Sequence, residues 1–193
     1  MLLYPCNIVG IIRLGLIGSA LGVLLVWGGL PETFGLRASF VALLGICALL
    51  DILDGHLARK LNQATLFGSR FDQIIDLLMH TLLWATSGFI LTIPLLALEW
   101  TAGLAVLRAS TRKEQHWKSA LNRSGNGFAR RYFANNQRNA ISIAANVSHF
   151  IFPAALILGQ TFFWAVYLSV PGVICYEAVT VIIVSSFARK PLV

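Results

Sequence analysis

Residues 51–76 read DILDGHLARKLNQATLFGSRFDQIID, and this stretch holds all four aspartates of the chain. Asp51 and Asp54 are three residues apart, and Asp72 and Asp76 are four apart. In a helix, each spacing places both carboxylates on one side. The first pair ends one apolar segment and the second pair begins the next. The short connection predicts an antiparallel helical hairpin in which the two pairs face each other.

The composition indicates that the solvent of this chain is lipid. Its 193 residues are 57% hydrophobic and 12% charged, and the mean hydropathy is +0.75. Soluble domains are about 25% charged, and disordered chains are poor in apolar residues. Six apolar stretches are long enough to cross a bilayer as helices, namely residues 8–29, 37–54, 70–92, 92–109, 139–158 and 163–187. We therefore expect an all-α, polytopic membrane protein with six transmembrane helices, forming a single domain over residues 1–193.

The basic residues predict how this protein is oriented. The formal charge is +7, and most Lys and Arg residues fall in the second connection, the fourth connection and the C-terminal tail. Since cytoplasmic loops of membrane proteins collect basic residues, both termini and the aspartates are expected on the cytoplasmic side. No soluble basic module suggests a nucleic-acid partner. Cys6, Cys47 and Cys175 lack metal-ligand or disulfide spacing and are expected to fill apolar space.

The residue types around the aspartates indicate phosphate chemistry. Four neighbouring carboxylates at membrane depth need compensating positive charge. Carboxylate oxygens are hard ligands, and this many of them suit Mg²⁺ or Mn²⁺. We expect two such ions. Small residues among them permit close approach of a ligand, and an arginine offers a planar fork of donors to phosphate. We therefore expect phosphoryl transfer involving a lipid. The alternative from another class is a cation-binding membrane protein without enzymatic activity.

The same stretch resembles the signature of the CDP-alcohol phosphotransferases, D-x2-D-G-x2-A-R-x8-G-x3-D-x3-D. The resemblance implies six transmembrane helices, a homodimer and transfer of the phosphatidyl group of CDP-diacylglycerol to an alcohol, with release of CMP. It makes Asp51, Asp54 and Asp72 metal ligands, joined by Asp76, which is also the general base. The residues implied to hold the CDP-lipid are Gly55, Ala58, Arg59, Thr65 and Gly68.

Further stretches resemble the eukaryotic-type phosphatidylinositol synthases within that family. These are residues 61–68 (LNQATLFG), 4–13 and 124–133, and they imply myo-inositol as the acceptor. Leu77 stands where that group usually has Arg, so inositol 1-phosphate, glycerol 3-phosphate and serine stay open as acceptors. The basic loop 108–138 predicts either an anion pocket or attraction to anionic lipid headgroups. The candidate acceptor-binding residues are Arg130, Arg131, Arg138 and His80.

Several of these residues have simpler interpretations. Thr65 could cap the third long helix, Arg59 could be a positive-inside anchor, and His80 could be a core histidine. Glu177 lies within the sixth apolar stretch and is expected to need a partner, for which an arginine is suggested. Pro171-Gly172 could kink one long helix or mark the start of a shorter one. A turn is expected near Ile93-Pro94.

Overall fold

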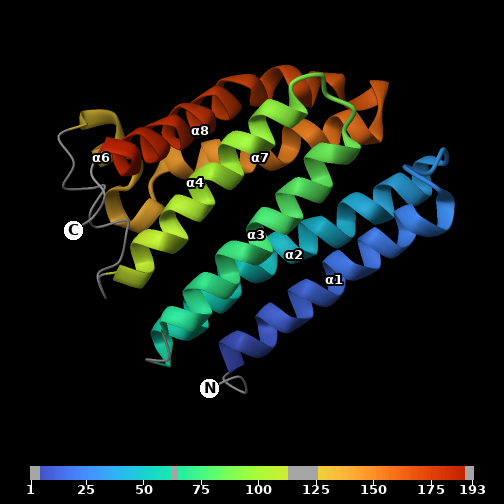
Figure 1. Cartoon of the computed structure of the whole chain (residues 1–193). Helices are drawn as coiled ribbons and strands as arrows, with labels where there is room; N and C mark the ends of the chain where they lie inside the picture. Colours follow the sequence, from blue (N-terminus) through green and yellow to red (C-terminus); the bar gives the residue numbers. More distant parts are fainter. Residues whose placement is uncertain (1–4, 62–64, 113–125, 190–193) are drawn as a thin grey trace. The chain divides into compact units, whose positions relative to one another are not determined.

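A computed structural model describes residues 5–61, 65–112 and 126–189 of the chain. In these ranges it contains seven α-helices, two short 3-10 helices and no β-strand, which confirms the all-α prediction. The six long helices are α1 (Pro5–Trp27), α2 (Phe34–Lys60), α3 (Leu66–Thr86), α4 (Thr92–Arg112), α7 (Ala140–Leu158) and α8 (Phe163–Arg189) (Figure 1). The shorter elements are α6 (Gly127–Tyr132), η1 (Ala134–Gln137) and η2 (Gln160–Phe162).

Each predicted apolar stretch corresponds to one long helix, but the turn between the third and fourth was predicted in the wrong place. We expected it near Ile93-Pro94, whereas α3 ends at Thr86 and α4 begins at Thr92. Gly88 supplies the turn with a φ of 69°, a backbone conformation that glycine adopts without steric cost. Pro94 lies in the first turn of α4, where a backbone N–H has no partner within the helix.

Four of the long helices are long and apolar enough to span a membrane. They comprise Asn7–Trp27 of α1, Phe34–Ala58 of α2, Ala140–Leu158 of α7, and Gln160–Ser186, which covers η2 and most of α8. This supports an integral, multi-pass membrane protein. α3 and α4 have 21 residues each, enough to cross, but each contains three charged residues. That all six helices span, with both termini in the cytoplasm, stays a prediction.

The chain divides into two compact units, and the first comprises residues 1–88 with 157–159. In it α1, α2 and α3 pack on one another (Figure 1). Gly10 permits the approach of α1 to α3, since a Cβ at this position would lie 2.8 Å from the ring of Phe71. Cys47 is buried in α2 and its thiol donates to the carbonyl of Arg13 at 3.8 Å. Interhelical contact in this unit thus depends on small side chains.

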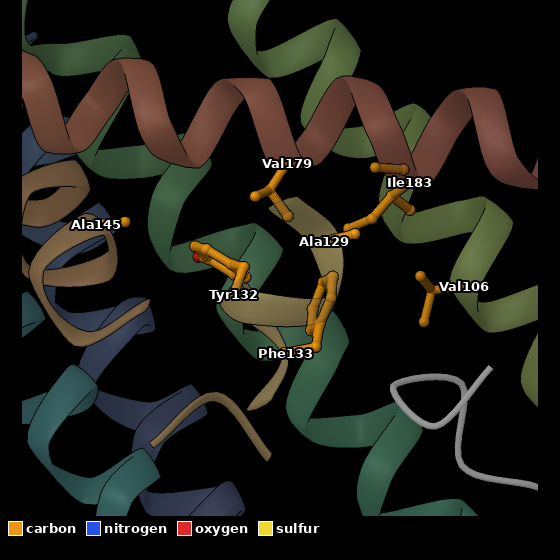
Figure 2. Close-up of a cluster of buried hydrophobic side chains, with 8 residues drawn as sticks. Val106, Ala129, Tyr132, Phe133, Ala145, Val179 and Ile183 are labelled. Atoms are coloured by element: carbon orange, nitrogen blue, oxygen red, sulfur yellow. The ribbon is translucent and has the colours of Figure 1, made fainter. Parts of the chain in front are cut away.

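The second unit comprises residues 89–156 with 160–193. Its core joins α4, α6, α7 and α8 through buried apolar side chains, among them Val106, Tyr132, Phe133, Val179 and Ile183 (Figure 2). Burial raises the pKa of the Tyr132 hydroxyl, which donates to Asn146 Oδ1 at 3.5 Å. The short helix α6 is thereby fixed to α7 by one aromatic side chain. That both units act as a single domain stays a prediction.

Pro171 and Gly172 lie inside one continuous helix, α8, so they do not start a shorter span. Gly172 marks a place where α8 approaches α7 closely. A Cβ at position 172 would overlap the side chain of Ser148 and would lie 3.1 Å from the carbonyl oxygen of Ala144. A glycine is therefore required by the crossing of these two helices.

Replacing Gly172 with alanine is expected to destabilise the protein by about 1–3 kcal/mol, because the two helices would have to move apart. The melting temperature in detergent, followed by tryptophan fluorescence, measures this. Gly18→Ala is the matched control, since no atom lies within 4 Å of a Cβ at that position of α1. The double variant Gly172→Ala/Ser148→Gly should recover much of the loss. Equal melting of Gly172→Ala and the wild-type protein would contradict the close crossing.

Candidate active site

The structure brings the four aspartates together in the first unit, around a single arginine. Asp51 and Asp54 lie on α2, and Asp72 and Asp76 lie on α3. All four carboxylates contact the guanidinium of Arg13, which comes from α1. The three helices therefore meet at one ionic cluster, which we call the aspartate cluster and define as these four residues with Arg13.

The contacts in the aspartate cluster are divided between the two terminal nitrogens of the guanidinium. Nη1 lies 2.9 Å from Asp51 Oδ1, 3.1 Å from Asp54 Oδ2 and 3.6 Å from Asp72 Oδ1. Nη2 donates to Asp76 Oδ1. One nitrogen thus stands among oxygens of three carboxylates, and the other pairs with the fourth.

The cluster is closed on one side and open on the other. The Arg13 side chain is fully buried, and that of Asp54 is 2% exposed. The other three carboxylates are much more accessible, with exposed fractions of 42% for Asp51, 36% for Asp72 and 40% for Asp76. A ligand can therefore reach Asp51, Asp72 and Asp76 from outside the unit, while Arg13 and Asp54 form the floor of the site.

Sequence reasoning assigned no role to Arg13. A signal was present, because this arginine lies inside the first apolar stretch, where an ionised side chain is costly without a partner. What the sequence does not contain is the identity of that partner. The contacts join Arg13 to residues 41 and 63 positions away, Asp54 and Asp76.

Thr65 and Gly68 both have a structural part in the entry to α3. The Thr65 hydroxyl accepts a hydrogen bond from the backbone N–H of Gly68 at 3.0 Å, so Thr65 is the N-cap of α3. A Cβ at position 68 would lie 3.2 Å from Thr65 Oγ1 and 3.3 Å from Asn7 Oδ1. The cap thus accounts for both residues without a ligand, and their contact with a CDP-lipid stays a prediction.

The remaining predicted site residues of the first unit are placed on the same two helices. Gly55 and Ala58 are half-buried on α2, and His80 is half-buried on α3, one turn beyond Asp76. The backbone of Arg59 is helical, but its side chain lies outside the described parts of the chain. Leu77 is buried, so its side chain does not belong to the open side of the aspartate cluster.

The predicted acceptor-binding arginines belong to the second unit. Arg130 and Arg131 are exposed on α6, and Arg138 is exposed directly after η1. Asn126 positions α6 by accepting hydrogen bonds from the backbone of Phe128 at 3.0 Å and of Ala129 at 3.1 Å. Residues 113–125 of the basic loop lie outside the described residues. A common anion pocket for the three arginines stays a prediction.

Glu177 has a different partner from the arginine that we expected. Its Oε1 lies 3.3 Å from Nε2 of His149 on α7. The ring of His149 stacks on Tyr176 with centroids 3.9 Å apart, and the Tyr176 hydroxyl donates to Glu99 Oε1 at 2.8 Å. Polar side chains of α4, α7 and α8 thus contact one another inside the second unit, where ionisable groups inside a membrane usually have a partner.

Comparison with protein families matches residues 4–184 to the CDP-alcohol phosphatidyltransferase model. The chain belongs to the CDP-alcohol phosphatidyltransferase family. Members transfer the phosphatidyl group from CDP-diacylglycerol to an alcohol, and the acceptor of this transferase is not fixed by the match. Comparisons with curated proteins and with solved structures find no significant match.

CDP-alcohol phosphatidyltransferases typically use a divalent metal ion, and the four carboxylates of the aspartate cluster are suitable ligands for such an ion. Four carboxylates supply hard oxygen ligands, and they already surround a cationic group in this structure. Asp54 Oδ1 is buried without a well-placed hydrogen-bond donor among the described residues, which leaves one carboxylate oxygen ready for a cation. The donor set is therefore of the right chemistry for Mg²⁺ or Mn²⁺.

The capping role of Thr65 in this transferase is testable. Thr65→Val keeps the size of the side chain but removes the oxygen, and is expected to lower stability by about 0.5–2 kcal/mol. Thr65→Ser and Thr65→Asp, which retain a capping oxygen, should melt close to the wild-type protein. Thermal unfolding in detergent measures the three variants. A wild-type melting temperature for Thr65→Val would show that the hydrogen bond to Gly68 does not stabilise α3.

Proposed function

We propose that the aspartate cluster is where this transferase moves the phosphatidyl group, and that myo-inositol is the acceptor. The products are then phosphatidylinositol and CMP. This location of the active site is supported by one observation: four carboxylates from α2 and α3 lie together, and three of them are open to a ligand. The choice of inositol is supported by the resemblance of residues 61–68, 4–13 and 124–133 to phosphatidylinositol synthases.

In this proposal Asp51, Asp54, Asp72 and Asp76 would hold two Mg²⁺ or Mn²⁺ ions. When bound, the ions neutralise the diphosphate of the CDP-lipid and stabilise the CMP that departs. The open side of the cluster admits the diphosphate, while buried Asp54 keeps the inner ligand position out of water. Gly55 and Ala58 leave space beside it on α2, and Arg59 and Thr65 offer donors to phosphate.

Asp76 is the proposed general base. Its carboxylate is 40% exposed, so an acceptor hydroxyl can come within hydrogen-bond distance of it. As the hydroxyl oxygen bonds to the lipid-bearing phosphorus, its proton passes to Asp76, and the bond from that phosphorus to the bridging oxygen breaks. The bridging oxygen leaves with CMP. The contact of Arg13 Nη2 with Asp76 Oδ1 holds the base in position for this transfer.

Other parts of the proposal concern the acceptor and the assembly. Inositol 1-phosphate, glycerol 3-phosphate or serine would use the same cluster and the same base. Arg130, Arg131, Arg138 and His80 remain the proposed acceptor-binding residues. A homodimer with the site facing the cytoplasm completes the proposal.

The acceptor is identified by CMP release from the purified protein in detergent with CDP-diacylglycerol and Mg²⁺ or Mn²⁺. Separate reactions contain myo-inositol, inositol 1-phosphate, glycerol 3-phosphate or serine. Release with inositol alone is the expected result. Release with a different acceptor would retain the chemistry and overturn the choice of inositol. Metal-independent release would overturn the two-ion site, and no release from a folded protein would favour a cation-binding protein without activity.

Asp76→Asn tests the base directly. We expect CMP release to fall by about 10²–10⁴-fold, the usual contribution of a general base, while CDP-diacylglycerol still binds. Initial rates at saturating substrate measure the loss, and equilibrium binding of the CDP-lipid is measured separately. Glu32→Gln is the matched control, because Glu32 is an exposed carboxylate outside the aspartate cluster. Wild-type turnover in Asp76→Asn would assign the proton transfer to another group.

A further inference from the structure

Arg13 occupies the position in the aspartate cluster where a shared cation would bind. Its Nη1 lies 2.9–3.6 Å from oxygens of Asp51, Asp54 and Asp72, which belong to two different helices. Mg²⁺ binds oxygen at about 2.0–2.1 Å, so an ion shared by the same three oxygens would overlap this nitrogen. A guanidinium and a bridging metal ion therefore exclude each other at this place.

Electrostatic repulsion also opposes the binding of metal ions beside Arg13. Within the cluster, four carboxylates face the one guanidinium of Arg13. Carboxylates attract divalent ions, but the buried positive charge of Arg13 repels any cation that enters. Burial makes this repulsion stronger than it would be at a protein surface, because water screens it less.

We propose that Arg13 is the counter-ion of the metal-free site, and that divalent ions bind by displacing its Nη1 from Asp51, Asp54 and Asp72. Arg13 thereby sets how tightly this transferase binds its metal. The inference rests on the proposed function in one respect, namely that the aspartate cluster is the metal site. The inference adds a residue of α1 to a site whose four aspartates all lie on α2 and α3.

The displacement that we propose leaves α1 in place. The backbone of Arg13 contacts α2 through the thiol of Cys47, and α1 packs against Phe71 of α3 at Gly10. In this inference, rotation about the last bonds of the long arginine side chain carries Nη1 away while Nη2 keeps its contact with Asp76. In the metal-loaded enzyme Arg13 then remains as a positioning residue for Asp76.

Binding of Mn²⁺ to the chelator-stripped protein in detergent tests this inference without reference to activity. Free Mn²⁺ is quantified by electron paramagnetic resonance for the wild-type protein, Arg13→Gln and Arg13→Lys. Arg13→Gln removes the charge and is expected to bind Mn²⁺ at least about tenfold more tightly. Arg13→Lys keeps the charge but loses the planar fork, so its affinity should lie between those of the other two.

Thermal unfolding supplies the second measurement. Metal-free Arg13→Gln should melt below the metal-free wild-type protein, since four carboxylates lose their counter-ion, and saturating Mn²⁺ should remove most of the difference. Arg37→Gln is the matched control. Arg37 binds the carbonyl oxygens of Pro31 and Ile157 at 2.7 Å and 3.4 Å, and lies about 20 Å along α2 from Asp51. Its loss should lower stability equally with and without Mn²⁺ and leave Mn²⁺ affinity unchanged.

The outcomes separate this inference from the proposed function. Tighter Mn²⁺ binding by Arg13→Gln supports it, and if that variant does not fold, tighter binding by Arg13→Lys does so. Wild-type or weaker affinity in the folded variants, together with normal CMP release by the wild-type protein, would overturn the role of Arg13 alone. Absence of Mn²⁺ binding in all three proteins would overturn the metal site and, with it, the inference.

Discussion

In the first unit, Arg13 of α1 contacts aspartates of both α2 and α3, and these ionic contacts hold three helices to one point. An unpaired charge in a lipid-facing bundle is costly, so neither the arginine nor the buried Asp54 can be accommodated alone. The same requirement explains why the cluster is closed around Arg13 and Asp54 and open at the other carboxylates. The charges that fix the helices are thus also the charges presented to a ligand.

The second unit also brings polar side chains of three helices together, but with different residue types. His149 pairs with Glu177 and stacks on Tyr176, which donates to Glu99, so that α4, α7 and α8 share one polar network. Apolar side chains alone specify poorly which helix faces pack together. Polar contacts between helices and close crossings such as that at Gly172 make this packing more specific.

Helix ends decide where the predicted site residues lie on their helices. Thr65 begins α3 so that Asp72 and Asp76 follow within its first three turns, and Asn126 begins α6 so that Arg130 and Arg131 follow within one or two. In both cases a single side chain fixes the first residue of the helix, and the 3.6-residue period then decides which side chains share a face. Local hydrogen bonds at Thr65 and Asn126 therefore fix where α3 and α6 begin, and with that the faces on which these side chains lie.

The sequence by itself determined the six long helices, the pairing of aspartates within each helix and the family, because these depend on periodicity, hydropathy and spacing over short stretches. It misplaced the turn before α4, where the conformational freedom of Gly88 prevailed over the turn signal at Pro94. Only the tertiary structure decided that Arg13 joins the aspartates and that His149, not an arginine, pairs with Glu177. These partners lie far apart in the chain, and their meeting depends on how whole helices pack.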